Sequence, residues 1–255
     1  MLSKSRLKYL KSLHQKKVRD EEGVFIIEGK KISCDVFCSD SEIVSICATE
    51  DFIKEHDAHI TAKNVVAEVI SQHELQSISC LQHPDDCFMV VRKKNLHPDF
   101  SYLASTLSVY LDGIRDPGNL GTILRLCDWF GIKNVYCSSD TVDVYNPKVI
   151  QSSMGSFLRV MPFYISISEL CEHFPSSALF DVYGTFMEGE NVLSIEKFSP
   201  GIMVIGNEAN GIREEINQFI TKKITIPSFS SGAESLNAAM ACAVILGQFR
   251  RLTTR

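Results

Sequence analysis

The segment from Leu111 to Ser138 constrains the fold of this chain more than any other part of its sequence. Its letters, LDGIRDPGNLGTILRLCDWFGIKNVYCS, predict a buried strand, a polar turn, an apolar helix and a second strand. The turn formers Asp, Pro, Gly and Asn fill positions 116–119. Continuous apolar strands joined through a helix are typical of a parallel sheet covered by helices. The segment therefore predicts an α/β fold.

The rest of the chain divides into two parts of this general kind. In the second part we expect strands in the apolar runs SVYLD, NVYCS, IMVIG and ITIP. In the first part we expect helices at 3–17 and 71–77 and strands at 24–29, 44–49 and 87–92. A polar stretch at 92–106 is the expected linker. These patterns predict a small α/β domain at 1–95 and a parallel-sheet α/β domain at 106–255.

Composition places the chain among ordinary globular proteins. Hydrophobic residues make up 45% of its 255 residues and charged residues 22%. The sequence contains neither an apolar run long enough to span a bilayer nor a signal-peptide pattern, so we expect no membrane association. Its nine cysteines include no CxxC pair, and no histidine cluster joins them. This predicts free thiols in a reducing cytoplasm and no zinc site.

Basic residues gather at the N-terminus, although the net charge of the chain is −5. The first twenty residues contain one acid, Asp20, against Lys4, Arg6, Lys8, Lys11, Lys16, Lys17 and Arg19. Further arginines at the C-terminal end are Arg250, Arg251 and Arg255. Such a basic patch can bind nucleic-acid phosphates. A solvated lysine-rich helix face and a transit peptide are the alternatives that this composition leaves open.

The chain lacks the common motifs that bind phosphate-bearing cofactors. No GxGxxG follows a strand and no GxxxxGK[ST] is present, which disfavours a Rossmann dinucleotide site and a P-loop. The GxSxG elbow of serine hydrolases is also missing. We therefore expect any ligand at the strand ends to be held by groups other than its phosphates.

Polar loops follow three of the expected strands. After the first loop, Asn119 stands at the entrance of the expected helix and Arg125 about a turn and a half into it. Arg125 lies inside the apolar run ILRLC, where a charge is costly unless it is paired or used. It is either a group facing a pocket, able to bind a phosphate or act on a hydroxyl, or one half of an ion pair with Asp128. Asn119 by itself is more simply explained as a helix N-cap.

The second and third loops carry further polar candidates. In GNEANG, Glu208 precedes the helical turn that favours acids, so the helix macrodipole does not explain it. In IPSFSSGAESLN, Ser235 and Asn237 precede a long apolar helix, and Ser235 is equally explained as a helix cap. The three loops together predict one composite site.

The order and combination of these motifs resemble those of the SpoU-type RNA ribose 2′-O-methyltransferases of the SPOUT superfamily. The elements NLGTILR, GNEANG and IPSFSSGAESLN carry the resemblance, which spans nearly the whole chain. In the first domain, KKVRDEEGVFIIEGKK and LQHPDDCFMVV resemble the family's accessory RNA-binding domain, which is similar to the ribosomal-protein L30e fold. The resemblance implies a trefoil knot in the second domain, S-adenosylmethionine bound in a bent form, and a homodimer. We expect the C-terminal helix at 236–252 to lie in the dimer interface.

The resemblance also implies roles for individual residues. The catalytic set falls on Asn119, Arg125, Glu208, Ser235 and Asn237. Cofactor contacts fall on Thr185 in the sequence YGT and on Gly206, Ile226 and Leu236. RNA contacts are expected from Lys16, Lys17 and Arg19, and no metal is expected. Because arginine is normally always charged, Arg125 would serve either as an activated base or as a charge that orients the hydroxyl and stabilises the developing oxyanion.

Two positions depart from the family pattern. The third motif commonly has IPM and then a glycine, whereas this chain has one extra residue before Ser235, which predicts a differently shaped cofactor loop. Gln151 stands where the family often carries an arginine, which predicts the loss of one RNA phosphate contact.

The implied reaction is methyl transfer from S-adenosylmethionine to a ribose 2′-hydroxyl in RNA. The accessory domain favours ribosomal RNA over transfer RNA as the substrate. The alternatives are a transfer-RNA ribose methyltransferase and a noncatalytic RNA-binding module with a degenerate pocket. The intact catalytic set argues against the noncatalytic module, and the missing phosphate loop argues against a flavodoxin-like enzyme that uses another nucleotide.

Overall fold

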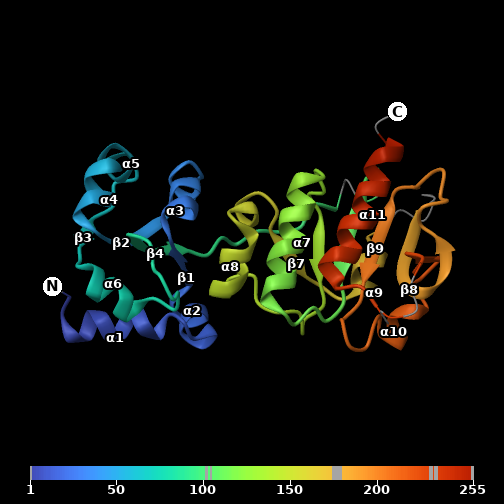
Figure 1. Ribbon diagram of the computed structural model, residues 1–255, viewed down its shortest axis with the longest axis horizontal. Helices are drawn as coiled ribbons and strands as arrows, with labels where there is room; N and C mark the ends of the chain where they lie inside the picture. The colour runs from blue at the N-terminus through green and yellow to red at the C-terminus, as the bar shows by residue number, and fades with distance from the viewer. Residues whose placement is uncertain are drawn as a thin grey trace. The chain divides into compact units, whose positions relative to one another are not determined.

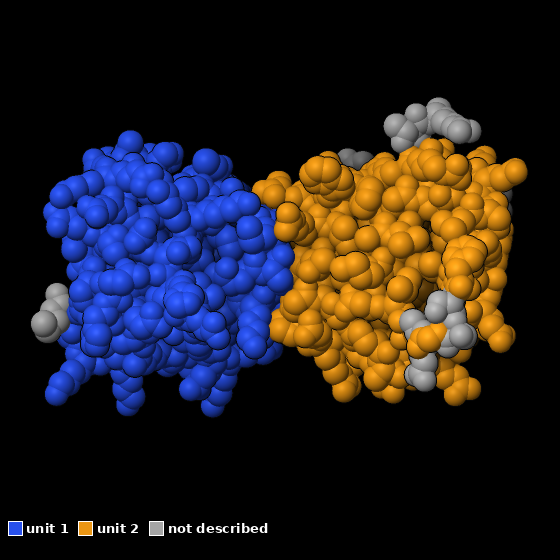
Figure 2. Space-filling view, in the orientation of Figure 1, with its two compact units in different colours: residues 1–96, 145–158 blue, residues 97–144, 159–255 orange. Residues whose placement is uncertain are grey.

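The computed structural model describes residues 2–100, 103, 105–173, 180–229, 232 and 235–253. The chain forms two compact units, which Figure 2 colours separately. Unit 1 comprises residues 1–96 and 145–158, and unit 2 comprises residues 97–144 and 159–255. Residues 145–158, which lie in the sequence range of the second expected domain, pack with unit 1. Of the helices in the described residues, none is both long and apolar enough to cross a membrane.

Unit 1 is built around a mixed four-stranded sheet in the order β1-β4-β2-β3. Strand β4 pairs antiparallel with β1 and β2, and β2 pairs parallel with β3. The strands are β1 (Val24–Glu28), β2 (Ile43–Ala48), β3 (Ala67–Val69) and β4 (Cys87–Arg92). The helices are α1 (Lys4–Ser12), α2 (Lys16–Glu22), α3 (Lys30–Phe37), α4 (Glu50–Glu55), α5 (Asp57–Ala62), α6 (Gln72–Ile78), α8 (Pro147–Ser153) and the 3-10 helix η2 (Ser156–Leu158).

Alternate residues of β1 face opposite sides of this sheet. Ile26 packs in a core cluster with Leu10, which follows from the apolar spacing of the N-terminal helix. Phe25 faces the other side, where its ring centroid lies 4.7 Å from that of Tyr145 and 5.8 Å from that of Phe157. These aromatic contacts attach segment 145–158 to unit 1.

The basic N-terminal segment forms two short helices rather than the single helix expected at 3–17. Helix α1 ends at Ser12 and α2 begins at Lys16, with a turn between them. Leu10 and Leu13 are fully buried on the side that faces the sheet core. The basic segment is therefore an integral part of the packed unit.

Unit 2 is built around six strands in the order β10-β8-β9-β5-β6-β7, and every neighbouring pair is parallel (Figure 1). The strands are β5 (Leu107–Leu111), β6 (Val135–Cys137), β7 (Pro162–Tyr164), β8 (Asp181–Asn191), β9 (Gly201–Ile205) and β10 (Lys222–Thr225). The helices are α7 (Pro117–Trp129), α9 (Ile167–Glu172), α10 (Glu214–Asn217) and α11 (Ala238–Thr253). The predicted α/β fold with a parallel sheet is confirmed.

The register of the sheet places the polar loops at one edge. Strand β9 pairs with β5 from Leu107↔Gly201 to Leu111↔Ile205, so the two strands end side by side. In open parallel sheets this carboxyl edge is where ligands bind. Helix α7, which carries the first motif, packs against α11, which directly follows the third motif, in the same unit (Figure 1).

Strand β8 departs from regular pairing beside this edge. It pairs with β10 at Tyr183–Gly184 and again at Glu190–Asn191, and the register shifts between these two stretches. The pairing of β8 with β10 skips the intervening residues 185–189. Three of them, Thr185, Phe186 and Met187, line the cavity described below.

Candidate active site

The start of α7 is fixed by Asp116 rather than by Asn119. The Asp116 carboxylate accepts a hydrogen bond of 2.8 Å from the backbone N–H of Asn119, and Pro117 occupies the first turn. Proline is favoured there because its missing N–H costs nothing at a helix start. The interpretation of Asn119 as the N-cap is therefore wrong. Its carboxamide is left to make other contacts.

Asn119 connects the three predicted motifs. Its Nδ2 donates a hydrogen bond to Oε1 of Glu208, in the loop after β9. Its Oδ1 accepts a hydrogen bond of 2.9 Å from Nδ2 of Asn237, which precedes α11. One carboxamide thus joins residues that are 89 and 118 positions away in the sequence. The contact with Asn119 also accounts for Glu208, which the helix macrodipole does not explain.

The loop after β9 is held in a closed turn. The backbones of Asn207 and Gly211 form an isolated β-bridge with hydrogen bonds of 3.0 and 2.9 Å. A Cβ atom at Gly206 would overlap the backbone of Gly211 and Ile212, so a glycine is required at that position. The Asn207 side chain donates to the carbonyl of Gly113 at 2.7 Å and accepts from the N–H of Ala209. These contacts anchor the residues on either side of Glu208.

An ion pair with a buried carboxylate adds a second anchor that the sequence analysis missed. Asp112, whose side chain is fully buried at the end of β5, accepts hydrogen bonds from the Arg213 backbone N–H at 2.8 Å and from its Nε at 2.6 Å. Hydrogen bonding to Asp112 raises the pKa of the Arg213 guanidinium. Asp140 is a weaker partner of the same guanidinium, at 3.5 Å. The sequence did contain a signal for this ion pair. Asp112 is the last residue of the apolar run SVYLD, and a buried charge requires a partner.

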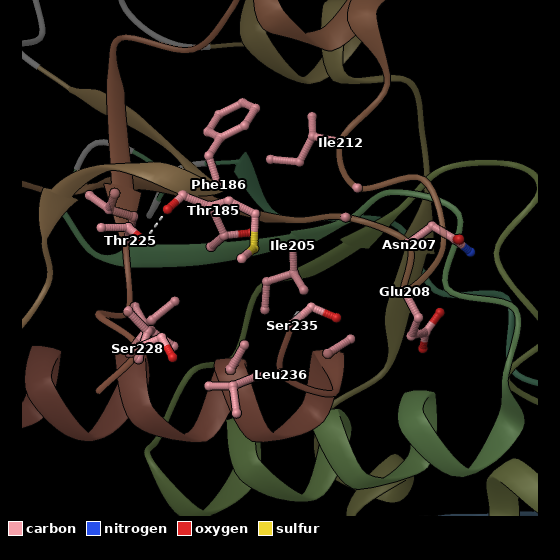
Figure 3. A pocket seen from close by; sticks show the side chains of 18 of the residues that line it. Thr185, Phe186, Ile205, Asn207, Glu208, Ile212, Thr225, Ser228, Ser235 and Leu236 are labelled. Carbon is pink, nitrogen blue, oxygen red and sulfur yellow. Dashed lines mark hydrogen bonds between the residues drawn. The ribbon is translucent and has the colours of Figure 1, made fainter. Parts of the chain in front are cut away.

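A cavity of about 740 Å³ opens at the carboxyl edge of the sheet (Figure 3). All four predicted cofactor residues line it, together with two members of the predicted catalytic set. These residues are Thr185, Gly206, Ile226, Leu236, Glu208 and Ser235. Figure 3 shows Asn207 and Glu208 at one end of the cavity and Thr225 and Ser228 at the other. The residues that the resemblance implies for the cofactor therefore gather around one cavity.

The lining fits S-adenosylmethionine in size and chemical character. A volume of this order is typical of small-molecule sites. Ile205, Ile226 and Leu236 supply apolar surface suited to an adenine ring, and the polar end with Glu208 suits a cation or a hydroxyl. Thr185 donates its hydroxyl hydrogen to the carbonyl of Val204 at 3.0 Å, which holds the β8 wall against β9.

Arg125 occupies an exposed position on α7 outside the lining of this cavity. Among the described residues it makes neither a hydrogen bond nor an ion pair. The alternative of an ion pair with Asp128 is wrong, because Asp128 pairs with Arg159 through hydrogen bonds of 2.7 to 3.2 Å.

The cap of α11 is Asn237 rather than Ser235. The Asn237 Oδ1 accepts from the backbone N–H of Ala239 at 2.9 Å and of Met240 at 3.3 Å. Asn237 therefore caps the helix with its oxygen while its Nδ2 binds Asn119. Ser235 is exposed at the cavity wall. Part of the extended loop before it, at 230, 231, 233 and 234, lies outside the described residues.

The three predicted RNA contacts differ in their surroundings. Lys16 and Lys17 are exposed, and each faces an acid one turn later, Asp20 at 3.1 Å and Glu21 at 3.8 Å. Arg19 is only 2% exposed. Its guanidinium donates to the carbonyls of residues 13 and 14 at 3.2 and 2.8 Å, so it is not an accessible phosphate contact. That part of the prediction is wrong, because Arg19 closes the turn between α1 and α2.

Gln151 has a partner within unit 1. Its Nε2 donates a hydrogen bond of 2.7 Å to the carbonyl of Glu28. In the described part of the chain, no group of three or more His, Cys, Asp and Glu side chains is arranged to hold a metal ion. Arg255, one of the C-terminal arginines, lies outside the described residues.

An α/β unit with a ligand cavity at the carboxyl edge of its parallel sheet defines a class of small-molecule-binding enzyme. Residues 106–247 match the model of the SpoU rRNA Methylase family, and residues 4–88 match the MRM3-like substrate binding domain. The first match covers more than half of the chain. The chain therefore belongs to the SpoU rRNA methylase family, and the resemblance inferred from its motifs is confirmed.

Two relatives match almost the whole chain. An uncharacterised tRNA/rRNA methyltransferase of Synechocystis is 27% identical over 249 residues, which are 96% of this chain and 90% of the relative. The 23S rRNA (guanosine(2553)-2′-O)-methyltransferase of Bacillus subtilis is 25% identical over 247 residues, 96% of each chain.

Solved structures agree over the same extent. A protein of Porphyromonas gingivalis assigned to the TrmH family of RNA methyltransferases is 30% identical with a TM-score of 0.81, covering 98% of this chain and 99% of its own. The AdoMet-bound rRNA methyltransferase of Sinorhizobium meliloti is 25% identical with a TM-score of 0.84, covering 98% and 97%.

Proposed function

We propose that this chain is an S-adenosylmethionine-dependent methyltransferase that methylates a ribose 2′-hydroxyl in RNA, with ribosomal RNA as the favoured substrate. The observation that carries the proposal is the bridge from Asn119 to Glu208 and Asn237 beside a cavity lined by every predicted cofactor residue. Membership of the SpoU family and the names of the relatives support the same chemistry.

The bound cofactor supplies an electrophilic methyl group on a sulfonium centre. Opposite it, the ribose hydroxyl needs a positioned partner, because a protonated hydroxyl is a weak nucleophile. We assign Glu208, held by Asn119, to the polar end of the cavity where this hydroxyl is oriented. Asn237 fixes the other side of the Asn119 carboxamide. Residues held in place in this way align the hydroxyl with the methyl group, and such alignment supplies a large part of enzymatic rate enhancement.

Arg125 is assigned a role that depends on RNA. Its exposed guanidinium has no partner among the described residues, so its charge can bind an RNA phosphate or face the reacting oxygen once RNA is present. Arginine supplies a fork of donors that matches phosphate geometry. We therefore infer that Arg125 acts on the ribose through charge and orientation, stabilising the developing oxyanion.

We assign selection of the RNA to residues 1–95 and catalysis to residues 106–255. The match to a substrate-binding domain supports the first assignment, as does the likeness of its motifs to the L30e fold. Lys16 and Lys17 remain proposed phosphate contacts. Lys4, Lys8 and Lys11 are exposed as well, and they make no ion pair with any described residue.

We further propose a homodimer, a trefoil knot in the catalytic domain and a location in the cytoplasm. Met240 and Val244, one turn apart on α11, are 57% and 38% exposed, which supports an interface on this helix. The knot follows from the family resemblance. Nine free cysteines support a reducing compartment.

The proposal is tested by incubating the purified protein with methyl-labelled S-adenosylmethionine and unmodified ribosomal RNA. Nucleoside analysis is expected to find the label on a ribose 2′-oxygen. The same assay with transfer RNA separates the two substrate classes. Label on a base, or no transfer although calorimetry shows cofactor binding, would contradict the proposed reaction. Addition of a chelator is expected to leave transfer unchanged.

A further inference from the structure

Unit 1 contains a pair of reactive side chains that the methyl-transfer reaction does not use. Cys80 lies just after α6 and is exposed. Its Sγ is 3.1 Å from Nδ1 of His14, in the turn between α1 and α2. A thiol within hydrogen-bond distance of an imidazole is the arrangement that activates cysteine nucleophiles, provided that the imidazole can accept the thiol proton.

The orientation of His14 makes it an acceptor toward the thiol. Its Nε2 lies 2.7 Å from the carbonyl oxygen of Ile78, and a carbonyl oxygen can only accept a hydrogen bond. In neutral His14 the ring hydrogen is therefore on Nε2, which leaves the lone pair of Nδ1 facing Cys80. Buried Arg19 holds the turn in place by donating to the His14 carbonyl at 2.8 Å.

Cys80 is positioned by a buried carboxylate on β1. Glu28, which is 4% exposed, accepts a hydrogen bond from the hydroxyl of Ser79, the residue before Cys80. The Ser79 oxygen in turn accepts from the N–H of Leu81 at 2.9 Å. The residues on both sides of the thiol are thus fixed by hydrogen bonds, and the sulfur itself remains at the surface.

We propose that Cys80 is a modification site at which, with His14 as its base, the protein reacts with low-molecular-weight disulfides such as glutathione disulfide. The proton of the Cys80 thiol moves to Nδ1 of His14. The thiolate attacks one sulfur of the disulfide, the sulfur–sulfur bond breaks, and the leaving thiolate takes the proton back from Nδ1. Cys80 is oxidised to a mixed disulfide, and the other half of the reagent is reduced to a thiol.

The charged groups around the thiol set how this reaction depends on pH. Burial and the nearby carboxylate of Glu28 raise the pKa of Cys80, while Lys148 on α8 lowers it. The resting side chain is therefore a protonated thiol at neutral pH. Exchange at neutral pH then depends on proton transfer to His14, whereas an unassisted thiol with this pKa would react appreciably only in alkaline solution.

Two other cysteines serve as internal comparisons. Cys38 is also exposed, and it makes no hydrogen bond with a described side chain. Cys34 lies 4.0 Å from Nε2 of His56 and is only partly exposed. If exposure alone decided reactivity, Cys38 would react as readily as Cys80.

The test treats the reduced full-length protein with glutathione disulfide at pH 7 and follows each cysteine by peptide mass spectrometry. Cys80 is expected to form the mixed disulfide first. His14→Gln keeps a donor for the Ile78 carbonyl but removes the base. It is expected to slow exchange by roughly tenfold or more and to move the rate profile to higher pH. Cys38→Ser is the matched control and should leave the rate at Cys80 unchanged.

The pH profile of the wild-type protein keeps the test independent of how well the variants fold. A Cys80 rate no greater than that of Cys38 at pH 7 would overturn the proposal. So would a wild-type profile that rises only in alkaline solution, as expected for a thiol without a base, or a folded His14→Gln variant that reacts as fast as the wild type.

Discussion

At the scale of single residues, Asn119 uses both ends of its carboxamide to connect the loops after β5 and β9 with the start of α11. Its Nδ2 donates a hydrogen bond to Glu208, and its Oδ1 accepts one from Asn237. Because both hydrogen bonds are made by the Asn119 carboxamide, replacing Asn119 disturbs the motifs of Glu208 and Asn237 together. The cavity walls that would hold the cofactor consist of other residues.

Asn119→Ala is therefore expected to lower the rate constant of methyl transfer by roughly 100-fold while changing the dissociation constant for S-adenosylmethionine only a few-fold. Single-turnover transfer and calorimetry measure the two quantities. Asn217→Ala, an exposed asparagine on α10, is the matched control and should behave like the wild type. A loss of cofactor affinity that matches the loss of rate would show that Asn119 acts on cofactor binding.

Arg125 and Asp128 lie close together on α7, but they have different partners. Because Asp128 pairs with Arg159, removal of the Asp128 carboxylate leaves the charge of Arg125 in place. Arg125→Ala is expected to abolish methyl transfer at unchanged cofactor affinity, and Asp128→Ala is expected to retain most of the activity. Both are measured by transfer to ribosomal RNA. Equal loss in the two variants would mean that helix α7, not the Arg125 charge, is what matters.

At the scale of elements, the end of β5 is tied to the loop after β9 by the pair Asp112–Arg213. Asp112→Asn breaks a pair whose carboxylate is fully buried, so the free energy of unfolding is expected to fall by about 2–3 kcal/mol. Asp140→Asn removes the weaker, partly exposed partner of the same arginine and should cost well under 1 kcal/mol. Denaturant unfolding measures both. Similar costs would assign the anchoring to the backbone contacts of Asn207.

The basic helices of unit 1 carry a prediction about RNA binding. Each phosphate contact contributes roughly 0.7 to 0.9 to the slope of log affinity against log salt. Lys16→Ala with Lys17→Ala is expected to flatten this slope by about 1.5 units and to leave the melting temperature unchanged. Arg19→Ala should lower the melting temperature instead, since Arg19 is buried. If the double variant has the same salt slope as the wild type, these two lysines do not contact RNA phosphates.

Elements with a strong local signal were predictable from the sequence, and those decided by tertiary contacts were not. The apolar runs of β5, β6, β9 and β10 and the turn formers before α7 located the carboxyl edge of the sheet. Strand β8, with its shifted register, has no such signal. The packing of segment 145–158 on Phe25 depends on a long-range aromatic contact that periodicity does not encode.

The same reason separates the predicted site residues that line the cavity from those whose surroundings the sequence did not predict. The family resemblance pointed to Gly206, Glu208 and Ile226, and these residues lie in the lining of the cavity. Several nearby polar side chains could cap each helix, and the sequence does not decide between them. Asp116 caps α7 in place of Asn119, and Asn237 caps α11 in place of Ser235. Burial of Arg19 depends on the turn that follows α1 and could not be inferred from charge.

At the scale of the whole molecule, the chain combines a unit that matches a substrate-binding domain with a unit that carries the methylase fold and cavity. This division predicts that affinity for RNA and affinity for the cofactor respond to different substitutions. A chain with net charge −5 can still present a local basic surface, because its first twenty residues contain seven lysines and arginines against one acid.

The central claim is tested most directly by mapping ribose 2′-O-methylation across all RNA of the source cells. Three strains are compared: one with the wild-type protein, one lacking it, and one carrying Asn119→Ala. We predict that a single ribosomal-RNA ribose loses its methyl group in the second and third strains. Identical methylation maps in all three strains would contradict the account.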